Sequence, residues 1–475
     1  MTDAVKLTRS QQRAYNAIMA GYNVFLTGHA GTGKSFLICQ VINELTEAKK
    51  KVAVAAPTGI AAINVGGTTL HRLFQLKPDI YVGKRPRVPT VLKHVDVLII
   101  DEISMCRVDL FDYIGQVLQK THRRIQVIVV GDFCQLPPVM PKRASPESYF
   151  DEKEILDHHF GFDVGSGYAF LSPQWQRINF KNMLLEEVVR QDDPHFIEAL
   201  DRARLGDTEV LRYFAENSNP QLLEGGIYLA GRNIEVDRRN ANRLAAIDAK
   251  SFTYEAESKG EVSAEDKRVA PEKLELKVGA RIMTTVNDPL GNYYNGSLGY
   301  VTKLDDEHIW VQIDDGIECE VLKNTWDIVR YEVEGDPDSE SAKFNRKIAG
   351  TYIQFPVKLA WAVTIHKSQG QTFTKVNLNP NCWDSGQLYV ALSRVKTIEG
   401  LHFTQRLYDG YLKLDPAVEE FYETAENSEP EYAGIARDMK YKAATKNKVK
   451  ERKTAASTHQ HEAEQQGEDA QMSLF

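Results

Sequence analysis

The chain has 475 residues, of which 42% are hydrophobic and 26% charged, proportions that are ordinary for a globular protein of several domains. Its net charge of −8 disfavours a protein that coats nucleic acid non-specifically, although a local basic groove remains compatible with that sum. No apolar run reaches the ~20 residues of a membrane span, the amino terminus lacks a signal-peptide core, and the five cysteines form no CxxC pair. We therefore expect a cytoplasmic protein without a disulfide framework or a zinc site.

Short apolar runs alternate with helical stretches between about residues 10 and 175. Four of these runs end at a polar residue or a glycine, as buried parallel strands do: "NVFLTG", "KVAVAAPTG", "VDVLIIDE" and "IQVIVVGD". Such strand–helix alternation predicts a doubly wound α/β sheet. The segment from Leu76 to Thr90 interrupts the pattern with three prolines and four basic residues, which indicates a small insertion.

The first strand is followed by "GHAGTGKS", which fits the P-loop spacing G-x-x-x-x-G-K-[ST] and precedes the helical stretch "FLICQVINEL". Glycines allow backbone N–H groups to face phosphates, lysine brings charge to the β- and γ-phosphates, and serine ligates Mg²⁺. The predicted nucleotide-binding residues of this motif are Gly28, Gly31, Thr32, Gly33, Lys34 and Ser35. The motif predicts binding of ATP or GTP with Mg²⁺.

Two later strands end in polar residues that suit phosphate hydrolysis. Asp101 and Glu102 follow "VDVLII", where we expect Asp101 to hold the metal and its neighbour to activate the attacking water. Gln135, in "GDFCQLPPV", would lie beside the nucleotide, where a neutral amide can sense the γ-phosphate.

A second α/β region is predicted from near Leu184, and it resumes at "YIQFPVKLAWAVTIHKSQGQTF". Between its halves, from Leu276 to Val333, short strands alternate with turns at Asn295-Gly296 and Asp315-Gly316, which suggests an inserted small β-barrel. After about Glu426 the composition changes to Glu, Lys, Gln, Ala and Ser, and we expect disorder.

The motif series resembles that of superfamily-one DNA helicases of the RecD and Pif (petite integration frequency) type. It comprises "GHAGTGKS", "APTGIAAINVGGTTLHRLF", "IIDEIS", "GDFCQLPPV", "VVRQ", "AWAVTIHKSQGQTF" and "YVALSRV". The resemblance covers about residues 7 to 405 and implies two RecA-like domains, a wedge insertion and an SH3-like β-barrel. The implied bounds are 1–176 for domain 1A with the wedge at about 76–93, 177–270 plus 350–425 for domain 2A, 271–349 for the barrel 2B, and 426–475 for a disordered tail.

The resemblance also implies roles in the nucleotide site. Arg190 in "VVRQ" and Arg394 in "ALSRV" match positions where the family places arginines against the γ-phosphate, across the cleft from the P-loop. Gln11 resembles an adenine-reading glutamine, but the adjacent Gln12 leaves the register open, and a plain helix-cap segment is the alternative. Gln369 and Gly370 complete the nucleotide-binding residues that the motifs imply.

Contacts to a DNA strand are implied for hydroxyl, imidazole and ammonium groups, which hold phosphates without reading bases. These residues are Thr58, Thr69, His71, Thr364, His366 and Lys367. Phe74, Tyr81 and Trp361 could stack on bases or could equally be core residues, and the two histidines could be structural. The adjacent pair His158-His159 is expected in a surface loop, because no carboxylate pattern supports a metal there.

The sequence therefore predicts an ATP-dependent 5′→3′ DNA helicase that moves along a single strand and unwinds tailed or forked duplexes, in replication, repair or recombination. Its polarity comes from the resemblance alone. The wedge would carry Lys84, Arg85 and Arg87. The alternatives are a superfamily-one RNA helicase, a clamp-tethered ATPase switch that does not unwind, and a RecD-like subunit of a nuclease complex, although no nuclease motif is present.

The carboxy-terminal segment contains two further features. Residues 437–453 include eight basic side chains, which could hold DNA phosphates loosely or could be a solvated linker. The final "QMSLF" resembles the Gln-x-x-Leu-Phe peptide that docks on bacterial sliding clamps, with Gln471 at the pocket rim and Leu474 and Phe475 buried. This motif implies a bacterial or phage source and action at the nucleoid, and an incidental terminus is its alternative.

Overall fold

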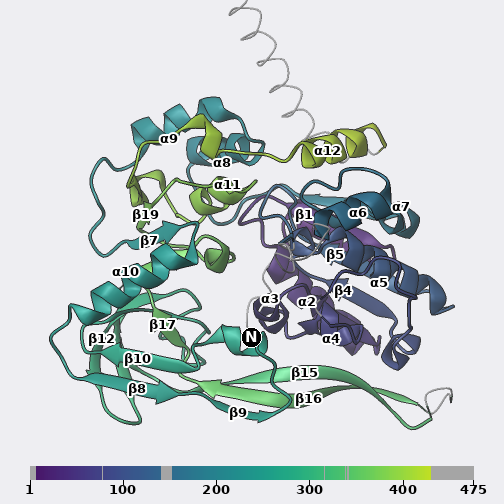
Figure 1. Ribbon diagram of the computed structural model, residues 1–475, viewed down its shortest axis with the longest axis horizontal. Helices are drawn as coiled ribbons and strands as arrows, with labels where there is room; N and C mark the ends of the chain where they lie inside the picture. Colours follow the sequence, from purple (N-terminus) through teal and green to yellow (C-terminus); the bar gives the residue numbers. More distant parts are fainter. Residues whose placement is uncertain are drawn as a thin grey trace, which may run out of the picture. The chain divides into compact units, whose positions relative to one another are not determined.

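The computed structural model (Figure 1) describes residues 7–77, 79–140, 152–314, 316–336, 339 and 342–428 of the chain. The chain divides into two compact units, Met1–Asp415 and Pro416–Phe475. In the second unit the described residues form one helix, α12 (Pro416–Ser428). The first unit contains two parallel sheets and a β-rich insertion, and all contacts below lie within it.

The first α/β region, residues 7–185, is built on a six-stranded parallel sheet with the strand order β3-β2-β4-β5-β1-β6. The strands are β1 (Val24–Gly28), β2 (Val52–Ala56), β3 (Thr68–Thr69), β4 (Val97–Ile100), β5 (Gln126–Val130) and β6 (Lys181–Leu185). The helices are α1 (Arg9–Met19), α2 (Lys34–Glu47), α3 (Gly59–Asn64), α4 (Leu70–Leu73), α5 (Val108–Lys120), α6 (Glu152–Phe160) and α7 (Pro173–Ile178). The predicted α/β fold with a parallel sheet is confirmed.

Both faces of this sheet are buried, which explains why its strands are almost uninterrupted apolar runs. Side chains alternate along β1, so Val24 and Leu26 share one core cluster with residues of α1 and α2. Phe25 points the other way, and its ring lies 5.3 Å from that of Trp175 in α7. Both faces of the sheet are therefore covered, and a site can form at the ends of its strands.

The first region extends beyond the predicted boundary at residue 176. Strand β6 pairs in parallel with β1 along its whole length, from Val24↔Lys181 to Gly28↔Leu185. The sequence alone suggested that this run opened the second region, because a strand carries no local mark of the sheet it joins. Its pairing with β1 places the segment before Arg190 beside the P-loop strand.

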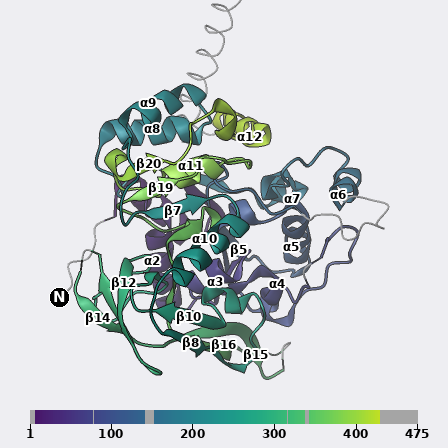
Figure 2. The ribbon, with the colours of Figure 1, turned by 60° about the vertical axis from the view of Figure 1, so that its left-hand side comes forward.

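The second α/β region, residues 194–245 and 360–415, contains a four-stranded parallel sheet in the order β18-β7-β19-β20. Its strands are β7 (Ile227–Ala230), β18 (Ala362–Thr364), β19 (Val376–Leu378) and β20 (Leu401–Phe403), and its helices are α8 (Pro194–Arg204), α9 (Leu211–Asn217), α10 (Asn233–Ala245) and α11 (Gln387–Leu392). Helices α8 and α9 lie side by side (Figure 2). Because β7 pairs with β18, this sheet is completed only by residues that follow the long insertion in the chain.

The β-rich insertion, residues 251–359, contains the antiparallel strands that the turn spacing predicted. The order β14-β13-β12-β11-β17 forms one sheet, β10-β8 a second and β15-β16-β9 a third. The strands are β8 (Ser251–Glu255), β9 (Glu257–Gly260), β10 (Lys273–Lys277), β11 (Arg281–Thr284), β12 (Leu298–Leu304), β13 (Ile309–Ile313), β14 (Glu318–Val321), β15 (Asn324–Glu334), β16 (Lys343–Gln354) and β17 (Val357–Leu359). Strand β8 precedes the predicted start at residue 271, and the SH3-like assignment stays a prediction.

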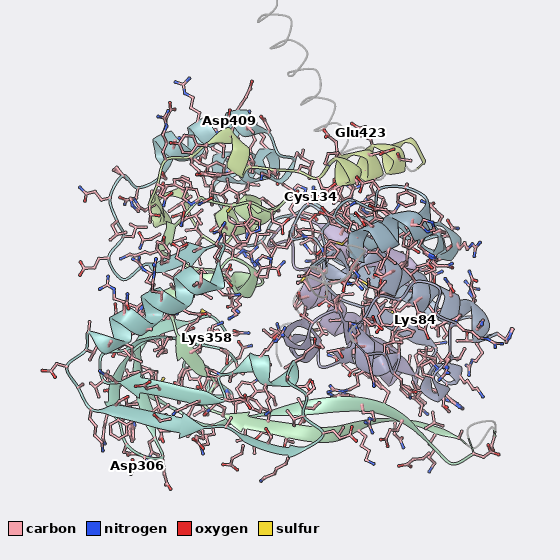
Figure 3. All side chains as sticks on the ribbon, viewed as in Figure 1. Lys84, Cys134, Asp306, Lys358, Asp409 and Glu423 are labelled. Atoms are coloured by element: carbon pink, nitrogen blue, oxygen red, sulfur yellow. The ribbon has the colours of Figure 1, made fainter. Side chains whose placement is uncertain are left out.

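The predicted wedge, at about residues 76–93, is mostly irregular where the structure describes it, and it ends in a 3-10 turn, η1 (Thr90–Lys93). Tyr81 is only 7% exposed, and its ring lies 5.4 Å from that of Tyr113 in α5. Lys84, labelled in Figure 3, forms an ion pair with Asp79 and lies over the Tyr81 ring. This segment is therefore anchored on α5 by an aromatic contact.

Candidate nucleotide site and nucleic-acid interface

The P-loop connects β1 to α2 and is packed tightly against two other segments. Gly31 and Gly33 have φ angles of 83° and 78°, in the left-handed region that favours glycine. A Cβ atom at Gly31 would lie 2.5 Å from Cβ of Arg190, and one at Gly33 would lie 2.6 Å from Nε2 of Gln11. Both glycines are therefore required by backbone conformation and by space, and the loop lies between Gln11 and Arg190.

Lys34 begins α2, and its ammonium group lies within the loop. Its Nζ donates to the carbonyl oxygens of Gly28 at 2.7 Å and His29 at 3.0 Å. Burial lowers the pKa of Lys34 to about 8, although the charges of Asp132 and Glu102 oppose this shift. An ammonium group that donates to neutral carbonyl oxygens would bind a charged phosphate more strongly than it binds these oxygens.

Gln11, and not Gln12, contacts the P-loop. Its Nε2 donates to the Thr32 carbonyl at 3.0 Å, while its Oε1 accepts from the Thr8 backbone N–H at 3.0 Å in a capping box. Gln12 is exposed and bonds to Asn16 one turn along the helix. Of the two glutamines, Gln11 is therefore the one whose side chain both caps α1 and contacts the P-loop, and its reading of adenine stays a prediction.

The carboxylates of Asp101 and Glu102 lie at the carboxyl end of β4. Burial and the charge of Glu102 raise the pKa of Asp101 to about 7, and burial also raises the pKa of Glu102. Glu102 has a φ of 51°, an uncommon conformation for a residue other than glycine. Carboxylate oxygens and a serine hydroxyl, here those of Asp101, Glu102 and the P-loop residue Ser35, are the donor types that Mg²⁺ prefers, so these residue types fit that ion.

Two arginines of the predicted site lie together, and neither forms a hydrogen bond or ion pair with a carboxylate in the described part of the chain. Arg190 donates from Nη1 to the Ser393 carbonyl at 3.2 Å. Arg394 is 2% exposed, and it donates to the Val390 carbonyl at 2.8 Å and the Ser393 hydroxyl at 2.7 Å. Burial and the charge of Arg190 lower the pKa of Arg394 to about 9. Such buried cations favour an anionic ligand.

Gln369 and Gly370 lie close to Arg394. The Arg394 guanidinium reaches the carbonyl oxygens of Ser368 at 3.5 Å and Gln371 at 3.4 Å, on either side of the pair. The side-chain nitrogen of Gln369 is buried without a hydrogen-bond partner among the residues described. An orphaned buried donor at this position is compatible with a nucleotide contact.

Gln135 faces a charged pair that the sequence reasoning missed. Its Nε2 donates to Oδ2 of Asp132 at 3.4 Å, and the same carboxylate binds the guanidinium of Arg204 in α8. Asp132 stands in the quoted motif "GDFCQLPPV", so its acidic side chain after a strand was a signal that could have been used. Arg204 has no such signal, because it lies in an ordinary amphipathic helix.

The three threonines predicted to contact DNA are tied to the ends of helical turns. The hydroxyl oxygens of Thr58 and Thr69 accept from backbone N–H groups at the starts of α3 and α4. Thr364 accepts from the Lys367 backbone N–H at 3.4 Å, ahead of the 3-10 turn η6 (His366–Ser368). Each hydroxyl keeps its hydrogen for a further acceptor, so a phosphate contact remains compatible with the cap.

The two histidines predicted to contact DNA are partly buried, and burial lowers the pKa of both His71 and His366. They therefore favour the neutral form at pH 7, and they offer hydrogen bonds more readily than charge. Trp361 packs partly against the core of the β-rich insertion. Phe74, at 2% exposed, and Tyr81 are core residues, so base stacking by these two rings is excluded in this arrangement.

Lys358, labelled in Figure 3, was not predicted, yet its side chain is close enough to the predicted DNA-contacting residue Lys367 for the charge of Lys367 to affect its pKa. It is in β17, where it pairs with Met283 of β11. Burial and the charge of Lys367 lower the pKa of Lys358 to about 8, and no ion pair to it is seen in the described residues. A lone lysine within the apolar run "FPVKLAWAV" was the available signal.

The β-rich insertion covers part of the predicted DNA-contacting surface. Arg72 of α4 forms a bidentate ion pair with Asp266 of the 3-10 turn η5 (Asp266–Val269), at 3.1 and 2.6 Å. A Cβ atom at Gly59 would lie 2.9 Å from the Glu265 carbonyl oxygen. The hydroxyl of Tyr331 in β15 also accepts from the Val54 backbone N–H at 3.0 Å.

A P-loop with paired carboxylates, together with Arg190 after β6 and the buried Arg394 after α11 of the second α/β region, defines a P-loop nucleotide hydrolase of two α/β regions. The family model described as PIF1-like helicase matches residues 6–152. An ATP-dependent DNA helicase Pif1 of Campylobacter jejuni is 32% identical over 449 residues, which cover 85% of this chain and 95% of that protein. The chain belongs to the PIF1-like helicase family, and it is an ATP-dependent DNA helicase.

Two structures of a Bacteroides sp Pif1 extend this likeness, each at 32% identity and covering 90% of this chain. The structure in complex with ADP-AlF4 has a TM-score of 0.78 and is covered to 98%. The structure bound to ssDNA has a TM-score of 0.61 and is covered to 99%. The arrangement described here is thus more similar to the structure whose description names no DNA.

Gln471, Leu474, Phe475 and the basic residues 437–453 lie outside the described residues. No described helix is both long and apolar enough to cross a membrane. No cluster of three or more His, Cys, Asp or Glu side chains that could hold a metal is found in the described ranges. The pair His158-His159 is exposed as expected, but the predicted loop is wrong, because both residues lie on helix α6.

Proposed function

We propose that this helicase moves 5′→3′ along single-stranded DNA by coupling ATP hydrolysis to closure between its two α/β regions. The observation that carries the proposal is that Arg190 and the buried Arg394 lie together and donate hydrogen bonds only to neutral oxygens among the described residues. A γ-phosphate held by Lys34 would supply the missing negative charge. Hydrolysis removes that link, so the regions separate after each turnover.

The remaining residues of the site have distinct proposed roles. Gln11 and the P-loop backbone bind the nucleotide, with Gln369 and Gly370 at its rim. Mg²⁺ held through Ser35 and Asp101 would neutralise phosphate charge, and Glu102 would orient and deprotonate the attacking water. Gln135 would report the presence of the γ-phosphate. The arginines stabilise the charge that develops during phosphoryl transfer, a contribution of ~10³–10⁵ in rate in related enzymes.

The DNA strand is proposed to contact Thr58, Thr69 and His71 in the first region and Thr364, His366 and Lys367 in the second. Groups from both regions on one backbone would allow each region to hold the strand in turn. Opening a base-pair step costs about 1.4 kcal/mol on average, which is small compared with the free energy of nucleotide turnover. The SH3-like barrel would close over the same strand.

Strand displacement on duplexes with 5′ or 3′ tails, with and without ATP, tests the direction. We expect ATP-dependent displacement of the 5′-tailed duplex alone. Displacement of the 3′-tailed duplex would contradict the polarity, and strand-stimulated ATPase without displacement would favour the non-unwinding switch. Repeating the assay with an RNA tracking strand distinguishes the RNA helicase alternative.

The segment at about residues 76–93 is proposed to act as the wedge that separates strands. Its anchorage on α5 through Tyr81 and Tyr113 would hold Arg85 and Arg87 on a fixed support. Shortening the insertion from Leu76 to Thr90 should reduce unwinding while translocation and strand-stimulated ATPase continue. Equal loss of all three activities would indicate that the segment supports the fold.

The carboxy-terminal "QMSLF" is proposed to bind a bacterial sliding clamp, which would raise the local concentration of the helicase at replication sites. A peptide of the final fifteen or so residues should bind a clamp in the micromolar range typical of short motifs. Leu474→Ala with Phe475→Ala should remove binding and leave unwinding unchanged. Clamps that bind neither the peptide nor the full chain would contradict this proposal.

A further inference from the structure

An ion pair buried on both sides joins the two α/β regions near the nucleotide site. Arg204, the last residue of α8, donates from Nη2 to Oδ1 of Asp132 at 2.8 Å and from Nε to Oδ2 at 3.1 Å. The side chains are 1% and 0% exposed. Asp132 follows β5 in the first region, so the pair connects the end of that strand to a helix of the second region.

The carboxylate of Asp132 also organises the loop that carries Gln135. It accepts from the Cys134 backbone N–H at 3.1 Å and from Gln135 Nε2 at 3.4 Å. Cys134, which stands between Asp132 and Gln135 in the chain, is labelled in Figure 3. Burial alone would raise the pKa of Asp132, but the charge and hydrogen bonds of Arg204 hold that pKa below its usual range. The carboxylate is thus ionised, and it binds Arg204 and Gln135 together.

Other contacts keep α8 and α11 close to the same loops. Asp201, one turn before Arg204 in α8, contacts the His29 imidazole of the P-loop. The Tyr389 hydroxyl of α11 accepts from the Ala30 backbone N–H at 3.0 Å. A Cβ atom at Gly386 would lie 2.2 Å from the Gln135 carbonyl oxygen, so the backbone of this loop approaches α11 too closely for any side chain there.

Stability alone is a weak reason for such a pair. Removing two charges from water is costly, and well-packed apolar residues of similar volume often stabilise a fold as well or better. Arginine, however, presents two parallel N–H groups, which fix the orientation of a carboxylate. The geometry is therefore better explained by orientation of Asp132, and through it of the Gln135 amide, than by folding free energy.

We propose that Arg204 is a positioning residue: through Asp132 it holds the Gln135 amide in the orientation that faces the γ-phosphate, and it thereby links phosphate sensing to the second α/β region. This inference rests on the role proposed above for Gln135. Arg204 touches neither nucleotide nor DNA in this scheme. Its displacement when the two regions separate would release Gln135.

Steady-state ATP hydrolysis with saturating single-stranded DNA tests this role in two backgrounds. Arg204→Lys keeps the positive charge but loses the two parallel N–H donors of the guanidinium. We expect kcat to fall about tenfold, a size typical of coupling between residues in contact, and KM to change less than about twofold. In a Gln135→Ala background the same substitution should have no further effect. The matched control is Arg202→Lys on the same helix, whose partly exposed pair with Asp207 should be replaceable without effect.

The outcomes separate the possible explanations. Equal loss of kcat in both backgrounds, or parent kcat in Arg204→Lys, would overturn the positioning role while the role of Gln135 stands. Parent turnover in Gln135→Ala alone would overturn the sensing role, and with it this inference. If Arg204→Lys does not fold, as judged by its melting temperature, Asp132→Asn provides the second variant, and the same non-additivity with Gln135→Ala is expected.

Discussion

The nucleotide-facing and DNA-facing surfaces of this helicase differ in how completely they are assembled. At the nucleotide site, the P-loop, Lys34 and the two arginines already lie together, and charged groups such as Arg394 have only neutral partners. At the predicted DNA surface, the threonine hydroxyls cap helical turns and Arg72 is engaged by Asp266 of the β-rich insertion. One surface has ligand positions available, whereas the other is partly covered.

We infer that nucleotide binding requires little rearrangement of the P-loop, whereas a strand can reach the α3–α4 surface only when the η5 turn of the insertion releases Arg72. An equilibrium between covered and open arrangements would reduce the apparent affinity for DNA by the fraction that is covered. Substitutions at the nucleotide site should therefore reduce ATP hydrolysis, whereas loss of the contact that covers the DNA surface should strengthen DNA binding.

The largest effect is expected from Lys34→Ala. Because Lys34 faces the phosphates and not the core, ATP hydrolysis and unwinding should fall by about a hundredfold or more while single-strand binding and the melting temperature are retained. Colorimetric phosphate release and strand displacement measure the loss. Lys50→Ala, near the end of the same helix, is the control, and normal hydrolysis by folded Lys34→Ala would refute the P-loop assignment.

Arg394→Ala and Arg190→Ala should each keep nucleotide affinity within a few-fold and reduce turnover by ~10³. In each variant the transition-state charge would lose an arginine partner, which for Arg394 comes from the second region, whereas ground-state binding depends mainly on the P-loop. Fluorescent-nucleotide binding and single-turnover hydrolysis separate the two effects. Arg212→Ala, an exposed arginine of α9 paired with Glu216, should behave as the parent; an arginine variant that hydrolyses at the parent rate would be structural.

Asp266→Asn should strengthen DNA binding, in contrast to the substitutions above. Loss of the ion pair with Arg72 shifts the population toward the open arrangement, and we expect about a three- to tenfold lower Kd for a single strand. Fluorescence anisotropy at fixed salt measures this Kd, and Glu272→Gln, which alters an exposed pair with Lys267, is the control. Weaker binding by Asp266→Asn would mean that the pair supports the DNA-binding form.

Lys358→Gln should have the smallest effect, a few-fold loss of single-strand affinity and a salt slope reduced by about one. Its pKa of about 8 adds a pH test. The ammonium charge is present below that pH and is lost above it, so the difference between parent and variant should shrink as the pH rises from 7 to 9. Lys323→Gln in the same insertion is the control, and a pH-independent difference would exclude phosphate binding by Lys358.

Local features of the site were predictable because their residues are neighbours in the chain. The P-loop glycines, Lys34 and the following helix form one continuous segment, and their φ angles and backbone donors follow from local sequence. The same holds for Asp101 and Glu102 at the end of a β-branched strand, and for the α/β alternation that predicted the parallel sheets. These features depend on short-range spacing and on buried apolar runs.

Long-range packing decided the rest. That β6 joins the first sheet, that Tyr81 is buried against Tyr113, and that Asp132 binds Arg204 are consequences of contacts between segments far apart in the chain. A parallel strand carries no local record of its neighbour, and an arginine in an amphipathic helix carries no record of which carboxylate it will meet. The sequence by itself therefore determined the chemistry of the nucleotide site, whereas only the tertiary structure decided which distant groups orient it, because orientation depends on packing across the whole unit.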